Sequence, residues 1–177
     1  MSVYAGLDLS LTGTGLVFIG EDGKVMQQEL IQTSPPKKKS SKATIERIDG
    51  IRKAIMWHLI RQNVNLVAIE GFSYGSKGNA LFQIAYLGYA IREELLNQGI
   101  EFIEPTPGNL KKFATAKGNA PKNVVMLEVY KKWGVEFTDD NLADAFILAQ
   151  IAREVEQNNK LHKYQEEVIK TIKREVS

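Results

Sequence analysis

The chain has 177 residues, of which 44% are hydrophobic and 25% are charged, with a formal net charge of +2. These values are typical of one ordinary globular domain. The lack of cysteine excludes disulfides and thiolate ligands. No apolar run approaches the ~20 residues of a membrane span, and the N-terminus has no signal-peptide pattern. We therefore expect a cytoplasmic protein without a membrane partner.

The first part of the chain predicts three strands that pair as an antiparallel meander. Residues 3–9 and 16–20 are apolar, the turn signal "EDG" occupies 21–23, and 24–33 forms the third strand. Residues 34–42 read as a loop, because proline, serine and four lysines cannot supply a core. We interpret these lysines as solvated surface.

Helices and buried strands alternate in the rest of the chain. We predict helices over about 44–62, 79–97, 120–133, 140–156 and 157–177, strands over 65–72 and 100–105, and a short helix within 106–123. This order predicts an α/β fold with a five-stranded mixed sheet whose first strand is central. We expect one domain over 1–156, extended by the helix at 157–177.

Acidic residues stand at the ends of buried strands and at the start of a late helix. Asp8 ends the first strand and Glu70 ends its expected parallel neighbour, where active sites of such sheets gather. Asp140 and Asp144 are spaced i and i+4, on one helical face. Asp139 or Asp140 could instead cap that helix. Convergence of the two strand acids with the two helix acids predicts a catalytic carboxylate cluster.

Four neighbouring carboxylates cannot all stay ionised without cations. Oxygen ligands select Mg²⁺ or Mn²⁺ over zinc. Two such ions, about 4 Å apart, can activate an attacking water and stabilise a leaving oxygen in phosphodiester cleavage. The acids therefore predict a nuclease with two metal ions.

The turn after Asp8 allows two interpretations. "DLSLTGTG" resembles the first phosphate loop of the actin and sugar-kinase superfamily, which needs a second domain that this chain has no room for. No Walker-type lysine motif is present either. In the nuclease interpretation, Ser10 and Thr12 shape a tight turn that a DNA phosphate can approach.

Basic and aromatic residues indicate contact with DNA. Residues 105–127 contain four lysines and no acid. Lysines and backbone amides in such a loop suit a phosphate backbone. These lysines are Lys111, Lys112, Lys117 and Lys122. Phe72, Tyr74 and Lys77 lie in the glycine-bearing loop after Glu70, where aromatics can stack on unpaired bases. Phe72 could instead pack into the core.

The helix at 79–97 is apolar on two sides. One stripe faces the sheet, and a second contains Phe82, Tyr86 and Tyr89. Such a helix has more surface to bury than one sheet can cover. The second stripe predicts either a self-association face or burial under the terminal helix.

Four blocks, in this order, make the chain similar to the RuvC family of Holliday junction resolvases, particularly the shorter-motif members of phages of Gram-positive bacteria such as lactococcal phages. The blocks are "AGLDLSLTGTGLV", "LVAIEGFSYGSKGNALFQIAYLGYAI", "EPTPGNLKKFATAKGNAPKNVVM" and "DDNLADAFILA". The resemblance implies an RNase H-like fold, a homodimer, and Mg²⁺-dependent paired nicks across a four-way DNA junction. It also implies action in the cytoplasm of a bacterial host if the protein is phage-encoded.

The resemblance assigns roles to individual acids. The metal-binding acids of the family match Asp8, Glu70 and Asp144. Many members place a fourth acid where this chain has Asn141. We expect Asp140 to reach the same face of the helix and to replace it.

The resemblance also assigns the DNA contacts. Lys111 and Lys122 match basic residues near the scissile phosphate, with Lys122 counted among the catalytic groups. The aromatic that stacks at the junction centre falls near Ser73, so Phe72 or Tyr74 would substitute. This departure leads us to expect activity on branched DNA beyond strict Holliday junctions. Rival functions are a non-cleaving junction-binding protein, an RNase H-like enzyme acting on RNA, and an actin-like nucleotide-binding protein.

Overall fold

A five-stranded mixed sheet is the centre of the computed structural model, which describes residues 2–38, 40–72, 78–157 and 159–176. The strand order is β3-β2-β1-β4-β5. The strands are β1 (Val3–Asp8), β2 (Gly13–Gly20), β3 (Val25–Gln32), β4 (Leu66–Ile69) and β5 (Glu101–Ile103). β1 pairs antiparallel with β2 and parallel with β4, which confirms the predicted meander and the central first strand.

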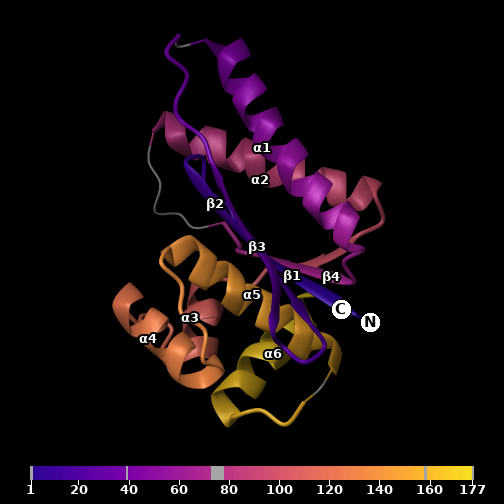
Figure 1. Ribbon diagram of the computed structural model, residues 1–177, viewed down its shortest axis with the longest axis vertical. Coiled ribbons are helices and arrows are strands. Elements are labelled where there is room, and N and C mark those ends of the chain that lie inside the picture. Colours follow the sequence, from indigo (N-terminus) through magenta and orange to yellow (C-terminus); the bar gives the residue numbers. More distant parts are fainter. Residues whose placement is uncertain (1, 39, 73–77, 158, 177) are drawn as a thin grey trace.

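Helices cover both faces of this sheet (Figure 1). They are α1 (Ser41–Gln62), α2 (Asn79–Asn97), α3 (Pro107–Thr115), α4 (Lys122–Trp133), α5 (Asp140–Gln157) and α6 (Lys163–Val176). α1 and α2 lie on one face, and the other four helices gather on the opposite face. None of the described helices combines the length and the apolar character that crossing a membrane requires.

Some element ends differ from the predicted ones because local hydrogen bonds set them. α1 begins at Ser41 rather than at Thr44, since the Ser40 side chain caps it by accepting a hydrogen bond from the backbone N–H of Ala43. β2 begins at Gly13, because its pairing with β3 extends to Gln32. Thus the flanking loops are shorter than the sequence indicates.

The core lies in two layers, one on each side of β1. Ala5 and Leu7 pack with α1 and α2, whereas Tyr4 packs with α5 and its neighbours. All six residues of β1 are buried. A central strand that is covered on both faces is expected to be uniformly apolar, which makes its terminal Asp8 exceptional.

Two glycines let α5 contact the sheet backbone directly. A Cβ atom at Gly6 would lie 1.8 Å from the carbonyl oxygen of Ala145, and one at Gly15 would lie 2.2 Å from that of Asn141. No side chain fits at either place. This close approach brings the first turns of α5 to the end of β1.

The terminal helix α6 packs away from α2. It begins at Lys163 rather than at 157, and it buries Val168 and Ile172 among the residues of α3 and α5. The second stripe of α2 therefore stays uncovered, with Phe82 74% and Tyr89 65% exposed. This arrangement contradicts the alternative that the terminal helix buries the stripe.

Candidate active site

Two carboxylates stand side by side where β1 and β4 end. Leu7 of β1 is paired with Ile69 of β4, so Asp8 and Glu70 occupy neighbouring positions at the carboxyl edge of the sheet. The backbone N–H of Glu70 also donates to the carbonyl of Leu7, at 3.2 Å. Parallel pairing of the strands thus produces the juxtaposition that the sequence predicts.

A third acid, Asp144, comes to this edge from α5. Asp8 pairs with Gly15 in the sheet, and the turn of α5 at residues 141–145 lies directly against Gly15 and Gly6. The negative charge of Asp144 raises the pKa of both Asp8 and Glu70. Hence three acids from β1, the end of β4 and α5 share one electrostatic site.

The three carboxyl groups have pKa values well above those of free side chains. Burial, followed by repulsion from Glu70 and Asp144, raises the pKa of Asp8 to about 8. Burial and the charge of Asp144 raise the pKa of Glu70 to about 7. Burial raises the pKa of Asp144 to about 6, against the opposing charges of Lys122 and Lys111. The site therefore favours protons or other cations at neutral pH.

Because the pKa values of these three acids are raised, we expect the folding stability of the metal-free protein to depend on pH. Each acid has a folded pKa above its unfolded value near 4, so its stabilising contribution is complete below pH 4 and is lost as pH rises toward 8. We expect the loss between pH 5.5 and 8.5 to be on the order of 2–4 kcal/mol, equivalent to about 5–10 °C in Tm.

Differential scanning calorimetry in EDTA measures this effect. The acids with lowered pKa, such as Asp49 and Glu128, are ionised in both states throughout that window and do not mask it. A Tm that stays level or rises between pH 5.5 and 8.5 would contradict the proposed crowding of the carboxyl groups.

The donor set fits a divalent cation. Across the residues that the structure describes, no three His, Asp or Glu side chains are already gathered closely enough to enclose an ion. The donors are oxygen atoms only, which suits Mg²⁺ and Mn²⁺. A cation would also relieve the repulsion that raises the pKa of Asp8 and Glu70.

The two acids at the start of α5 have different partners. Asp139 accepts a hydrogen bond from the backbone N–H of Asn141 at 2.9 Å and therefore caps the helix. Asp140 forms an ion pair with Lys122 of α4, which lowers the pKa of Asp140. Lys122 also lowers the pKa of Asp8 and Asp144, so this lysine lies within electrostatic reach of the site.

The turn between β1 and β2 is closed by its own hydroxyl groups. The Ser10 hydroxyl accepts hydrogen bonds from the backbone N–H groups of Thr12 and Gly13, at 3.2 and 3.3 Å. Thr14 donates to the Ser10 carbonyl at 2.6 Å. Ser10 therefore organises the turn, while Thr12 is exposed beside it.

The predicted DNA-contacting residues divide into several groups. Lys111 acts on the carboxylates, since its charge lowers the pKa of Glu70 and Asp144. Lys112 instead pairs with Glu167 of α6 at 2.8 Å. Lys117 is exposed. Tyr74 and Lys77 lie outside the described residues.

Phe72 is 39% exposed and packs onto α2. Its ring lies 4.9 Å from that of Tyr89 and 4.5 Å from the guanidinium carbon of Arg92. The sequence-based prediction did not include Arg92, a buried charge within an apolar helix that also reaches the Glu70 carbonyl. The sequence offers no specific signal for this role, because Glu70 and Phe72 lie in a separate element from Arg92.

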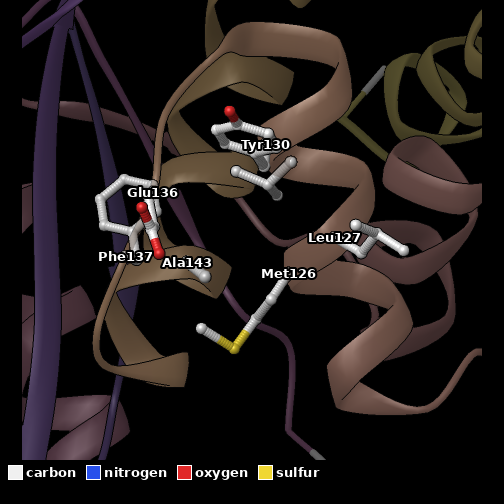
Figure 2. A pocket seen from close by; sticks show the side chains of 7 residues that line it. Met126, Leu127, Tyr130, Glu136, Phe137 and Ala143 are labelled. Atoms are coloured by element: carbon white, nitrogen blue, oxygen red, sulfur yellow. The ribbon is translucent and has the colours of Figure 1, made fainter.

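An apolar pocket between α4 and α5 is separate from the carboxylates. Figure 2 shows the side chains of Met126, Tyr130, Phe137 and Ala143 that line it. Its volume is about 430 Å³. Glu136 is the only charged residue among the described residues that line it. These lining residues include no set of polar groups that would perform chemistry.

Fold and site together define a class of protein. A meander that leads into a mixed five-stranded sheet, with helices on both faces, is an RNase H-like α/β fold. Solved structures of similar fold support this. Thermus thermophilus RuvC is 23% identical, with a TM-score of 0.72 over 88% of this chain and 96% of that one.

One eukaryotic structure and one viral structure share the fold at lower sequence identity. The yeast mitochondrial Holliday junction resolvase Ydc2 is 12% identical, with a TM-score of 0.59 over 96% of this chain and 81% of that one. The fowlpox virus Holliday junction resolvase is 14% identical, with a TM-score of 0.57 over 86% and 98%. Comparison with curated protein sequences gives no match.

The family itself is established by its sequence profile. The profile of "Crossover junction endodeoxyribonuclease RuvC" matches residues 4–152. The chain belongs to the RuvC family of crossover junction endodeoxyribonucleases, as its sequence blocks indicate. Membership makes it a Holliday-junction-resolving nuclease and implies dependence on a metal ion.

Proposed function

We propose that two copies of this chain bind a four-way DNA junction and cut it by paired Mg²⁺-dependent phosphodiester hydrolysis. The observation that supports this is the set of three buried or half-buried carboxyl groups with raised pKa values at the carboxyl edge of the sheet. We assign Asp8, Glu70 and Asp144 as ligands for two ions, with Asp140 as the fourth acid. Mn²⁺ is expected to substitute.

Each group of this chain has a defined task in the reaction. When bound, the two ions supply activation of the attacking water and stabilisation of the leaving oxygen. Asp8, Glu70 and Asp144 would hold them at the sheet edge. Lys122 and Lys111 supply positive charge beside the scissile phosphate. The products are a 5′-phosphate and a 3′-hydroxyl.

DNA contacts surround this centre. Ser10 and Thr12 shape the turn that a phosphate approaches, and Lys117 adds charge at the exposed loop after α3. Phe72 presents a partly exposed ring for base stacking. We retain Lys112, Tyr74 and Lys77 as predicted contacts with more distant parts of the DNA.

The exposed side of α2 supplies the surface for the homodimer. Leu81, Phe82, Tyr86 and Tyr89 are all exposed on this helix. A contiguous apolar surface of this kind is typical of protein interfaces. A two-fold dimer presents two equivalent sites to a nearly symmetric junction, which explains paired cuts. Thermus RuvC and fowlpox resolvase have both been solved with Holliday junction DNA.

The shorter-motif pattern leads us to propose a phage-type protein that acts in the cytoplasm of a bacterial host. The replacement of the junction aromatic favours a broader substrate range that includes other branched DNA. Fork and flap substrates in the same cleavage assay measure that range directly.

An end-labelled four-way junction tests the proposed function. The protein should introduce symmetric nicks with Mg²⁺ and none with EDTA, and binding should weaken steeply with salt. Binding without cleavage would indicate a junction-binding protein, and preference for an RNA–DNA hybrid would indicate a ribonuclease. Binding of ATP would indicate the actin-like class.

The adjacent residues Asp139 and Asp140 provide a matched test of whether Asp140 is the fourth metal-binding acid. Asp140→Asn removes the charge paired with Lys122 and should lower the cleavage rate about 10-fold or more, since a charge partner at the site is worth over ~1.4 kcal/mol. Asp139→Ala should cost about 1 kcal/mol of stability through loss of the helix cap and leave the cleavage rate unchanged. Equal cleavage rates of the two variants would show that Asp140 is not the fourth acid of the site.

A further inference from the structure

Arg92 of α2 is a buried cation that joins three separate parts of the chain. It is 6% exposed. Its Nε donates to Glu104 Oε1 at 2.6 Å, and its Nη1 donates to the Gly88 carbonyl at 2.9 Å. Its Nη2 donates to the carbonyl of Glu70 at 3.4 Å. The guanidinium fork therefore reaches the backbone of a proposed metal ligand from a different helix.

The same guanidinium holds the aromatic residue that follows Glu70. Its carbon lies 4.5 Å from the centre of the Phe72 ring, and that ring also contacts Tyr89. A Cβ atom at Gly88 would lie 2.6 Å from Phe72 Cε1, so the ring occupies a notch that only glycine leaves open. Arg92 thus covers Phe72 while it binds the Glu70 carbonyl.

Residues 70–72 need the support of Arg92 because the chain leaves the sheet after β4 ends at Ile69. The Glu70 N–H donates to Leu7 and the Gly71 N–H donates to Pro105 at 2.9 Å, which fixes one side of the segment. The other side borders a cavity of about 480 Å³ that Glu70, Phe72 and Arg92 line. Across this open space the segment is held by the Arg92 hydrogen bond and by the Phe72 ring in its notch at Gly88.

We propose that Arg92 is a positioning residue that aligns Glu70 for metal binding, through the Glu70 carbonyl and the Phe72 ring. This inference rests on the proposed function, because it concerns the same metal site. Arginine is required for this task since its planar fork contacts Glu104, Gly88 and Glu70 together, whereas lysine offers a single ammonium group. Groups that orient metal ligands typically change metal affinity about 10–100-fold when they are lost.

Arg92→Lys tests the proposal by direct metal binding. Calorimetric titration of the protein with Mn²⁺ alone should show affinity about 10-fold weaker, and the Mg²⁺ concentration for half-maximal cleavage should rise by about the same factor. Affinity for the junction in EDTA, which contacts between lysines and phosphates dominate, should be nearly unchanged. A shift in metal affinity without loss of DNA binding is an effect that general destabilisation does not produce.

Arg52→Lys is the matched control. Arg52 bridges Asp49 and Glu94 at 2.6 Å between α1 and α2, away from the site. The Arg52→Lys substitution should lower the Tm without altering Mn²⁺ affinity. If Arg92→Lys behaves like this control, the proposal is overturned, because Arg92 then serves stability alone.

Glu104→Gln keeps the proposal testable if Arg92→Lys does not fold. It removes the negative charge that holds Arg92 Nε, and with it the contact that orients the guanidinium toward the Glu70 carbonyl. A weaker Mn²⁺ affinity in this variant supports the proposal, and an unchanged affinity overturns it. A wild-type protein that binds no Mn²⁺ and cleaves no junction would overturn the proposed function instead.

Discussion

Asp8→Asn should abolish Mg²⁺-dependent cleavage of a four-way junction. Asp8 ends the central strand and is buried, and both Glu70 and Asp144 act on its pKa. An amide cannot neutralise a divalent cation, so the variant loses several kcal/mol of stabilisation, equivalent to about 10³-fold or more in rate. Single-turnover cleavage with excess protein measures this loss separately from DNA binding.

The same substitution should stabilise the protein when metal is absent. The raised pKa of Asp8 shows that its charged form is unfavourable in the folded state, and asparagine removes that charge. We expect the Tm in EDTA at pH 8.5 to rise by about 4–8 °C. Mg²⁺ should raise the Tm of the wild type and not that of the variant. Wild-type cleavage rates in Asp8→Asn would refute the metal assignment.

Gly6→Ala should strongly destabilise the fold. The added methyl group would lie 1.8 Å from the Ala145 carbonyl oxygen and 2.4 Å from the Ala149 nitrogen, both in the backbone of α5. Backbone atoms cannot rotate away as a flexible side chain can, so α5 must separate from β1. Overpacking of this kind costs about 3 kcal/mol or more. Urea denaturation measures the change in free energy of unfolding.

Gly50→Ala is the control for the glycine change itself. Gly50 lies within α1, and a Cβ atom added there would have no contact within 4 Å among the described residues beyond its own helical turn. Alanine there should stabilise the helix by about 0.5–1 kcal/mol. Equal stability of Gly6→Ala and wild type would show that α5 does not depend on this close approach, and Asp144 would then lack its fixed place beside Asp8.

Local patterns were sufficient for most of the fold. The alternation of apolar strands and helices predicted the order of the sheet, and the bounds of α2 agree with the expected 79–97. The hydrophobic repeat of a helix is visible in any stretch of its sequence. Ends of elements were less accurate, as at Ser41 and Lys163, because they depend on individual caps and tertiary contacts.

Local pattern could not distinguish the roles of neighbouring charges. Asp139 and Asp140 are adjacent acids, yet one caps α5 and the other pairs with Lys122. Lys111 and Lys112 are adjacent lysines, yet one acts on the carboxylates and the other binds Glu167. Lys122 and Glu167, the partners of Asp140 and Lys112, come from other helices, so spacing along the sequence carries no information about them.

The sequence by itself determined the family, the fold class and the three acids Asp8, Glu70 and Asp144 as candidates, because strand ends and helix faces follow from local periodicity. Only the tertiary structure decided that Arg92 reaches the Glu70 carbonyl and that the second stripe of α2 stays uncovered. Both facts depend on how helices pack across the sheet. Such packing is set by contacts between residues far apart in the chain, which no single stretch of sequence encodes.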